Sequence, residues 1–217
     1  MKCERIPLGA QGAYLDTYFL ADSPELKAGA CRPAVVVCPG GGYAYTSDRE
    51  AEPIALALCA RGFHACVLRY PCAPARFPAA LRALAEAVAW VRAGAAENHV
   101  DPRQISVCGF SAGGHLAGSL GVFWNAPFLA AETGLAPQDM RPDKMVLCYP
   151  VITGGEFAHK GSFDNLLGAD ADAARRAEVS LEQHVTQDTP PAFLWHTYTD
   201  PGVPVENTML FAMALRR

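Results

Sequence analysis

Short apolar runs alternate with longer segments of helical periodicity along most of the sequence, and this alternation restricts the fold more than any other feature. Continuous apolar strands separated by helices are typical of a mostly parallel sheet covered on both faces. After a strand or hairpin around 13–20, the predicted strands are 33–38, 64–70, 105–110, 144–149 and 192–198. The predicted helices are 49–61, 77–96, 112–123 and 205–217. We therefore expect an α/β fold with a doubly wound sheet in a single domain, 1–217.

The pattern loosens in 151–191, where Gly, Asp and His residues replace the regular alternation. We expect this segment to be an excursion over the carboxyl edge of the sheet, with one helix around 171–185. Doubly wound folds bind their ligands at that edge.

The composition excludes several classes of protein. Apolar residues make up 51% of the chain and charged residues 18%, which excludes intrinsic disorder. The net charge is −4 and no basic stripe is present, so a nucleic-acid partner is not expected. No apolar run approaches the roughly 18–20 residues that span a bilayer, and no apolar secretion core follows Met1. We expect no membrane association and a cytoplasmic protein.

The positions of the 8 cysteines predict reduced structural thiols. Cys38, Cys66, Cys108 and Cys148 each lie in or beside an apolar run, where a buried strand residue is expected. The sequence contains no Cys-x-x-Cys pair and no Cys/His cluster with zinc spacing, so we predict neither a disulfide framework nor a metal site.

The motif Gly109-Phe110-Ser111-Ala112-Gly113 follows a predicted strand and opens a predicted helix. A nucleophilic serine requires such a tight turn, which exposes its Oγ above the sheet, and small neighbours allow the turn without collision. The helix N-terminus directs N–H groups at an oxyanion, and the N–H of Ala112 is the nearest candidate donor. The alternative is a glycine-rich turn that only packs two backbones closely. The strand-to-helix context favours a nucleophile at Ser111.

A second glycine motif, Pro39-Gly40-Gly41-Gly42-Tyr43, directly follows the first core strand. Three glycines permit a loop whose N–H groups point inward, as in the His-Gly-Gly-Gly loop of lipases and esterases, although Pro39 stands in place of the histidine. Gly41 and Gly42 are the predicted oxyanion donors. A simple turn or a phosphate-binding loop is the alternative, but the phosphate-loop patterns are absent.

Asp200 lies on the turn after a late predicted strand, in the order Ser, Asp, His that this arrangement requires. An Asp that only forms an Asx turn before Pro201 is the alternative. The strand context and the two glycine motifs favour Asp200 as the acid of a catalytic triad.

Together these motifs resemble the α/β-hydrolase serine esterases of the acetyl esterase and acetyl xylan esterase type, including the bifunctional feruloyl/acetyl xylan esterases. The resemblance implies an α/β-hydrolase fold, Ser111 as nucleophile and Asp200 as acid. It implies small acyl esters as substrates, chiefly acetyl groups on carbohydrates; acyl transfer of this kind requires no cofactor. The matching segments are Pro39–Tyr43, Ser47–Glu50, Gly109–Leu116, Tyr149–Ile152, Trp195–Thr197, Asp200 and Val203–Asn207.

The same resemblance implies a catalytic histidine on a loop after one further strand, and no counterpart follows Asp200 in the sequence. His115 lies on the predicted helix after Ser111, and His196 lies in the strand before Asp200; for both, a bond to backbone is the commoner role. His159 and His184 lie in the excursion and could approach the mouth of the site, although a solvated loop position is the expectation for both. His64 and His99 begin strands or turns and are expected to be structural. We therefore expect a chain truncated before the final strand and its histidine loop.

Three hypotheses for function remain. The leading one is a serine esterase for small acyl esters. An oligopeptidase-like hydrolase uses the same elbow but is disfavoured because no propeller or gating domain is present. A hydrolase-fold protein that binds an acyl or sugar ligand without efficient catalysis is the third, because the histidine is missing.

Truncation also predicts an unpaired sheet edge at 192–198. Phe193, Leu194 and Trp195 are suited to burial, and 192–197 contains no Lys or internal Pro of the kind that blunts an edge. We expect self-association through this edge unless the helix 205–217 covers it.

Overall fold

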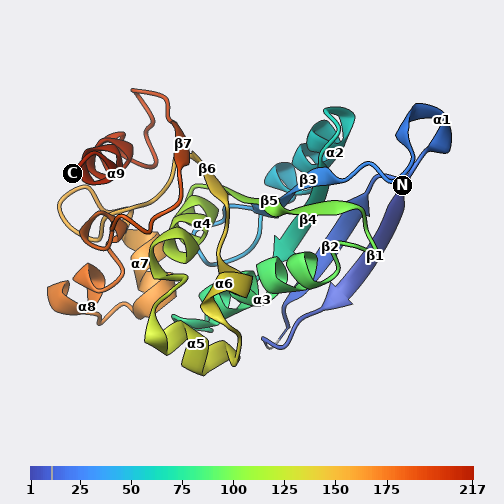
Figure 1. Cartoon of the computed structure of the whole chain (residues 1–217). Coiled ribbons are helices and arrows are strands. Elements are labelled where there is room, and N and C mark those ends of the chain that lie inside the picture. The colour runs from blue at the N-terminus through green and yellow to red at the C-terminus, as the bar shows by residue number, and fades with distance from the viewer. Residues whose placement is uncertain (11) are drawn as a thin grey trace.

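The computed structural model describes residues 1–10 and 12–217, and these contain one central sheet (Figure 1). Its strands are β1 (Lys2–Pro7), β2 (Tyr14–Phe19), β3 (Arg32–Cys38), β4 (His64–Arg69), β5 (Val100–Phe110), β6 (Lys144–Cys148) and β7 (Ala192–Trp195). Their order is β1-β2-β4-β3-β5-β6-β7. The β1–β2 and β2–β4 pairs are antiparallel and the other pairs are parallel. The predicted mostly parallel sheet is therefore confirmed.

The helices agree with the predicted pattern in the core and differ from it in the loops. They are α1 (Pro24–Lys27), α2 (Glu52–Ala60), α3 (Ala79–Ala93), α4 (Ala112–Phe123), α5 (Pro127–Thr133), α6 (Pro137–Met140), α7 (Lys160–Leu167), α8 (Ala173–Ala177) and α9 (Glu206–Leu215), with 3-10 turns η1 (Asp48–Glu50) and η2 (Leu181–Gln183). The four predicted helices correspond to α2, α3, α4 and α9. The single helix expected at 171–185 is wrong, because α8 ends early. Leu181 is completely buried and its N–H donates to the Ile152 carbonyl, which draws the chain back to the sheet.

The alternation of side chains along each strand divides the core into two parts. One face, with Val36, Ile105 and Val107, packs against α3 and α4. The other face, with Val35 and Val37, packs against α2. Figure 1 shows α2 on one side of the sheet and α3 on the other. Every residue of α4 is buried, so the helix that follows Ser111 is held firmly.

The face of the sheet that packs against α2 is covered less completely towards β7. An apolar groove of about 510 Å³ lies over β5, β6 and β7, and Cys108, Val146 and Phe193 are among the residues that line it. Among the described strands, β7 pairs only with β6, and Phe193 is 62% exposed. The predicted sheet edge is confirmed, although the strand ends at Trp195 rather than at Tyr198.

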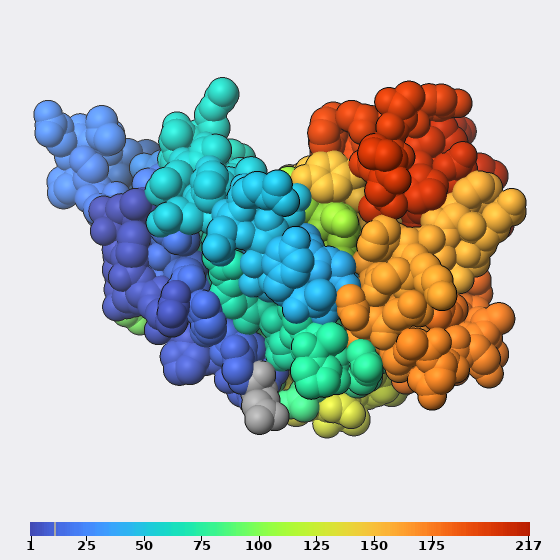
Figure 2. Space-filling model, turned by 180° about the vertical axis from the view of Figure 1, so that it is seen from behind, coloured from blue at the N-terminus to red at the C-terminus, as the bar shows by residue number. Residues whose placement is uncertain are grey.

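The carboxyl ends of β3, β5, β6 and β7 meet at one edge of the sheet because these strands are parallel. The segment 151–191 carries α7, α8 and η2 and lies over this edge, where the Asn165 side chain donates a 2.9 Å hydrogen bond to the Gly42 carbonyl. This segment therefore contacts the loop after β3 at this edge. Seen from behind, the surface is hollowed between the light-blue segment after β3 and the red C-terminal segment (Figure 2).

Candidate active site

Ser111 stands at a sharp turn between β5 and α4. Its φ is +53° and its ψ is −119°, a conformation that non-glycine residues rarely adopt and that marks local strain. The glycines on either side are sterically required: a Cβ on Gly109 would lie 2.1 Å from the Gly113 carbonyl oxygen, and a Cβ on Gly113 would lie 2.1 Å from that of Cys38. The five-residue motif thus folds as the strand-to-helix elbow that the sequence predicts.

The loop after β3 places Gly41 and Gly42 beside this elbow. Their φ angles are +131° and +64°, and a Cβ on Gly41 would lie 2.1 Å from the Tyr45 carbonyl oxygen. Within the part of the chain that the structure describes, neither N–H donates a hydrogen bond. The N–H of Ala112, the first residue of α4, has no partner in its own helix. The elbow and the loop therefore leave free donors of the kind that stabilise an oxyanion.

Asp200 follows β7 and faces the same cavity. Its Oδ1 accepts hydrogen bonds from the N–H groups of Gly202 (2.8 Å) and Val203 (2.9 Å). The residue therefore forms the Asx turn that was the alternative interpretation, and it also lines the cavity that contains Ser111. The two interpretations are compatible, because one carboxylate oxygen makes the turn while the other remains for a further partner.

One cavity of about 440 Å³ joins these residues from four loops. Ser111, Asp200, Gly41 and Gly42 line it together. Ala112 is completely buried behind Ser111. Glu50, Tyr149 and His159 complete much of the lining.

Two histidines, each four residues from a predicted triad residue in the sequence, are hydrogen-bonded to other groups. His115 is completely buried; its Nδ1 accepts from the Tyr43 hydroxyl at 2.8 Å and its Nε2 donates to the Val179 carbonyl at 2.8 Å. Burial lowers the pKa of His115 to about 4. His196 Nε2 donates to the Val203 carbonyl at 2.9 Å and lies 3.8 Å from the Asp200 carboxylate. Both interact chiefly with structural partners, as the sequence predicts.

Of the two histidines that the sequence places in the excursion near the mouth of the site, His159 lines the cavity. It precedes α7, and its Nδ1 accepts a 3.3 Å hydrogen bond from the Ser162 N–H, which leaves the proton on Nε2. None of the hydrogen bonds among the described residues joins a histidine to the Ser111 side chain. The base that the resemblance implies is therefore not in place beside the nucleophile.

Two further residues of the cavity, Glu50 and Tyr149, belong to none of the catalytic motifs that the sequence predicts. The Tyr149 hydroxyl donates to Glu50 Oε1 at 2.8 Å, and the Gly40 N–H donates to Glu50 Oε2 at 2.7 Å. Burial, and then the hydrogen bond to Glu50, raise the pKa of Tyr149. The only available signal was the position of both residues in segments that resemble the esterase family.

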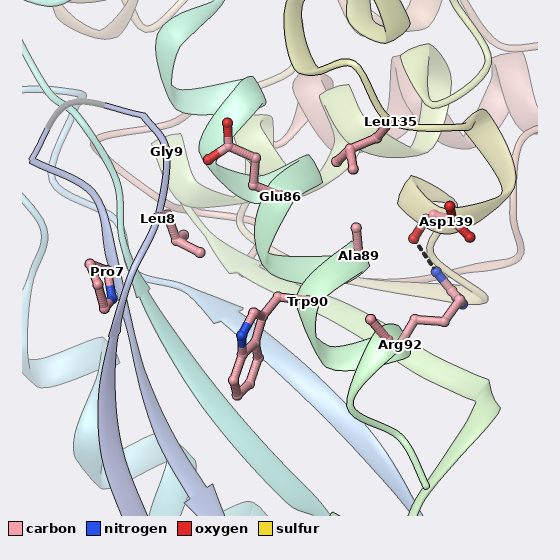
Figure 3. A pocket seen from close by; sticks show the side chains of 10 residues that line it. Pro7, Leu8, Gly9, Glu86, Ala89, Trp90, Arg92, Leu135 and Asp139 are labelled. Atoms are coloured by element: carbon pink, nitrogen blue, oxygen red, sulfur yellow. Dashed lines mark hydrogen bonds between the residues drawn. The ribbon is translucent and has the colours of Figure 1, made fainter. Parts of the chain in front are cut away.

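A second cavity, of about 530 Å³, lies away from Ser111 between the β1–β2 hairpin and α3 (Figure 3). Two of its polar side chains are already hydrogen-bonded within the chain. Glu86 accepts from the Ala10 N–H, and Arg92 donates to the Asp139 carbonyl, the contact drawn in Figure 3. With Leu8 and Trp90 as apolar walls, the site has no converging free donors comparable to those around Ser111.

Comparison with known proteins decides the family. The sequence model of the BD-FAE family matches residues 21–215. The chain belongs to the BD-FAE family. Among the relatives of this BD-FAE chain, Endo-1,4-beta-xylanase B of Butyrivibrio fibrisolvens is 38% identical over 85% of this chain and 30% of that protein.

Solved structures show the fold of this BD-FAE protein. An acetyl ester-xyloside bifunctional hydrolase from Caldicellulosiruptor lactoaceticus is 38% identical, with a TM-score of 0.85 over 98% of this chain and 81% of that one. The α/β hydrolase enzyme MGS-M1, from a Medee basin deep-sea metagenome library, is 32% identical, with a TM-score of 0.76 over 100% of this chain and 76% of that one. The α/β-hydrolase fold is therefore confirmed. The chain spans between 30% and 52% of the length of the curated relatives it matches.

Proposed function

We propose that this BD-FAE protein is a carboxylic ester hydrolase that acts on small acyl esters through an acyl-enzyme at Ser111. One observation carries the proposal: a serine on a strained elbow shares a cavity with the unpaired N–H groups of Gly41 and Gly42. An elbow that served only for close packing would not require a second loop with free donors beside it. Asp200 is the proposed acid.

In the proposed reaction, Ser111 Oγ attacks the ester carbonyl carbon and its proton passes to a base. The carbonyl oxygen becomes an oxyanion that accepts hydrogen bonds from Gly41, Gly42 and Ala112. Collapse of this intermediate breaks the bond to the alcohol, which takes the proton and leaves an acyl-serine. Water then attacks the acyl carbon, the bond to Ser111 Oγ breaks, Oγ takes up a proton from the water, and the carboxylic acid is released. The residues supply all of these roles except the base, and no metal or organic cofactor enters the proposed mechanism.

We propose acetyl esters of carbohydrates as the substrate class. The names of two similar proteins, a xylanase and an acetyl ester-xyloside hydrolase, support this class. The cavity supports it as well, because a volume of about 440 Å³ suits a small acyl group with one sugar unit. Its lining is rich in groups that hydrogen-bond hydroxyls, including Tyr45, Arg49 and Tyr149.

The proposal is tested by covalent labelling and by turnover. A fluorophosphonate probe should label Ser111, and the chain should hydrolyse a small aryl acetate. The Ser111→Ala variant should lose both signals, whereas Ser106→Ala, on the same strand, should keep them. Labelling that persists in Ser111→Ala contradicts the assignment of the nucleophile.

A catalytically impaired binding module is the second candidate, because no histidine hydrogen-bonds Ser111 within the described residues. For this candidate, calorimetry would detect binding of an acetylated xylo-oligosaccharide, with no acetate released and no label on Ser111. The oligopeptidase-like alternative predicts cleavage of aryl amides as well as esters.

Two further proposals concern the surroundings of the protein. We infer that chains self-associate through β7, whose outer edge has no strand partner among the described residues and whose Phe193 borders an apolar groove.

We also propose a cytoplasmic location, since all 8 cysteines are free thiols. None of the helices in the described residues has the length and apolar character needed to cross a membrane.

A further inference from the structure

Glu50 occupies an unusual position for an acidic side chain, because it lines the cavity and holds the first glycine of the proposed oxyanion loop. Its two carboxylate oxygens hold two different segments: Oε2 accepts from the Gly40 N–H at 2.7 Å, and Oε1 accepts from the Tyr149 hydroxyl at 2.8 Å. A Cβ on Gly40 would lie 3.2 Å from Ser111 Cβ, so the anchored residue is a direct neighbour of the nucleophile. The carboxylate thus connects the loop after β3 to the end of β6.

The backbone geometry of Gly40 explains what this anchor can do. The Gly40 carbonyl accepts a 2.9 Å hydrogen bond from the Ser47 N–H, and the Gly40 N–H is held by Glu50. Both polar groups of Gly40 are therefore tied to the turn 47–50. A trans peptide is planar, and its C=O and N–H point in opposite directions. Because the Gly40 carbonyl points at this turn, the N–H of Gly41 must point away from it.

The turn that carries Glu50 is itself fixed to the sheet. Arg69, the last residue of β4, lies 2.7 Å from the Asp48 carboxylate and donates to the Thr46 carbonyl at 3.2 Å. On the other side, the Tyr149 N–H donates to the Trp195 carbonyl at 2.6 Å, which fixes Tyr149 against β7. Burial and the Glu50 contact raise the pKa of Tyr149, so its hydroxyl remains a donor at neutral pH. The turn that carries Glu50 and its partner Tyr149 are therefore both fixed to the sheet.

We propose that Glu50 is a positioning residue that sets the direction of the Gly41 N–H by anchoring Gly40 to Tyr149. The inference rests on the proposed esterase function. Glu50 takes no proton in the reaction. Its effect falls on the transition state, because the oxyanion forms only there and depends on donors placed in advance.

Three substitutions separate the geometry of this anchor from its charge. Glu50→Ala removes both contacts. Glu50→Gln removes the charge but keeps an oxygen for the Gly40 N–H and an amide that can donate to Tyr149. Tyr149→Phe removes only one of the two contacts. Glu52→Ala is the matched control, since Glu52 is exposed, is absent from the cavity lining and contacts Tyr18 of β2.

The main readout is the dissociation constant of an aryl boronic acid, which forms a tetrahedral adduct on a nucleophilic serine and places an oxygen in the oxyanion hole. We expect Glu50→Ala to weaken binding by about 10- to 100-fold, somewhat less than the loss of a whole donor. The dissociation constant for Glu50→Gln should stay within about threefold of the wild-type value. The constant for Tyr149→Phe should lie between those for Glu50→Gln and Glu50→Ala. For aryl acetate hydrolysis by Glu50→Ala, kcat should fall while KM changes little.

Each outcome has a distinct meaning. If the boronic acid binds Ser111→Ala as well as it binds the wild type, the proposed function fails, and the role of Glu50 fails with it. If binding depends on Ser111 but is unchanged in Glu50→Ala, only the positioning role is wrong. If Glu50→Gln is as weak as Glu50→Ala, the charge matters rather than the geometry, and the inference is overturned. Circular dichroism shows whether each variant is folded; should Glu50→Ala unfold, Glu50→Gln and Tyr149→Phe decide the question.

Discussion

The Tyr43 hydroxyl donates a 2.8 Å hydrogen bond to Nδ1 of His115, and this contact joins the proposed oxyanion loop to the helix that begins at the elbow. The other ring nitrogen of His115 donates to the Val179 carbonyl, in the segment that covers the site. One neutral imidazole therefore connects three segments that surround Ser111. Its burial makes the connection sensitive to pH and to the loss of either partner.

The first prediction concerns the pH dependence of stability. Burial lowers the pKa of His115 from 6.5 to about 4, so between these values the unfolded chain binds more protons at this residue than the folded chain. Stability from this residue is fully present above pH 6.5 and is lost as the pH falls towards 4. We expect a loss of about 2 to 3 kcal/mol by pH 4.5. Urea unfolding of wild type and His115→Gln at pH 7 and 4.5 checks this; an equal pH dependence of the two would contradict it.

The second prediction concerns the partner of His115. Tyr43→Phe removes the donor and leaves Nδ1 buried, with only the Ser119 hydroxyl at 3.5 Å as a substitute. We expect a loss of about 1 to 3 kcal/mol in the free energy of unfolding, the usual result of leaving a buried polar group without its partner. Tyr198→Phe is the control, because Tyr198 is 78% exposed and should tolerate the change. Equal stability of the two variants would show that the contact is weak.

The third prediction tests the steric origin of the elbow. A Cβ on Gly113 would lie 2.1 Å from the Cys38 carbonyl oxygen, and backbone cannot move aside as a flexible side chain can. Gly113→Ala should destabilise the protein by more than about 3 kcal/mol or prevent folding. Gly161→Ala is the matched control: its Cβ would meet only the His159 ring at 3.7 Å, and alanine in α7 should stabilise by about 0.5 to 1 kcal/mol. Thermal unfolding of both variants provides the measurement.

The fourth prediction concerns turnover and the base. Because no imidazole hydrogen-bonds Ser111, the chain should hydrolyse aryl acetates slowly, with about 10³–10⁴-fold acceleration over water from binding and the oxyanion hole. His159→Ala and His196→Ala should each change the turnover number by less than about threefold, since a catalytic histidine would cost orders of magnitude more. A drop of a hundredfold or more in either variant would identify that histidine as the base.

The fifth prediction concerns the edge at β7. Phe193→Lys places a charge on an exposed edge strand, and such charges oppose strand pairing between molecules. In sedimentation experiments over a range of concentrations, the wild type should associate and Phe193→Lys should remain monomeric. Leu26→Lys, on the distant α1, should behave as the wild type does, because Leu26 is 82% exposed and lies outside the proposed interface. A wild type that remains monomeric at high concentration would show that the edge is covered.

The local sequence pattern was sufficient to predict the strands at the core of the fold. The apolar runs in β3 and β4 form strands whose residues are largely buried on both faces, as is typical of a continuous apolar run in a parallel sheet. The elbow was predictable for the same reason: Gly109 and Gly113 are required by contacts within a short stretch of chain and by one strand beside it. The segment 171–185 was not predictable, because distant contacts of Leu181 override its helical pattern.

By itself the sequence determined which residues carry reactive or donor groups and at which edge of the sheet they gather. Only the tertiary structure decided which of them meet. In the folded chain His159 lines the cavity, His115 and His196 donate hydrogen bonds to backbone carbonyls, and Glu50 contacts Gly40 and Tyr149. The physical reason is that the partners of a side chain can lie far along the sequence, as with Glu50 and Tyr149, which are 99 residues apart. Neither periodicity nor local spacing records such distances.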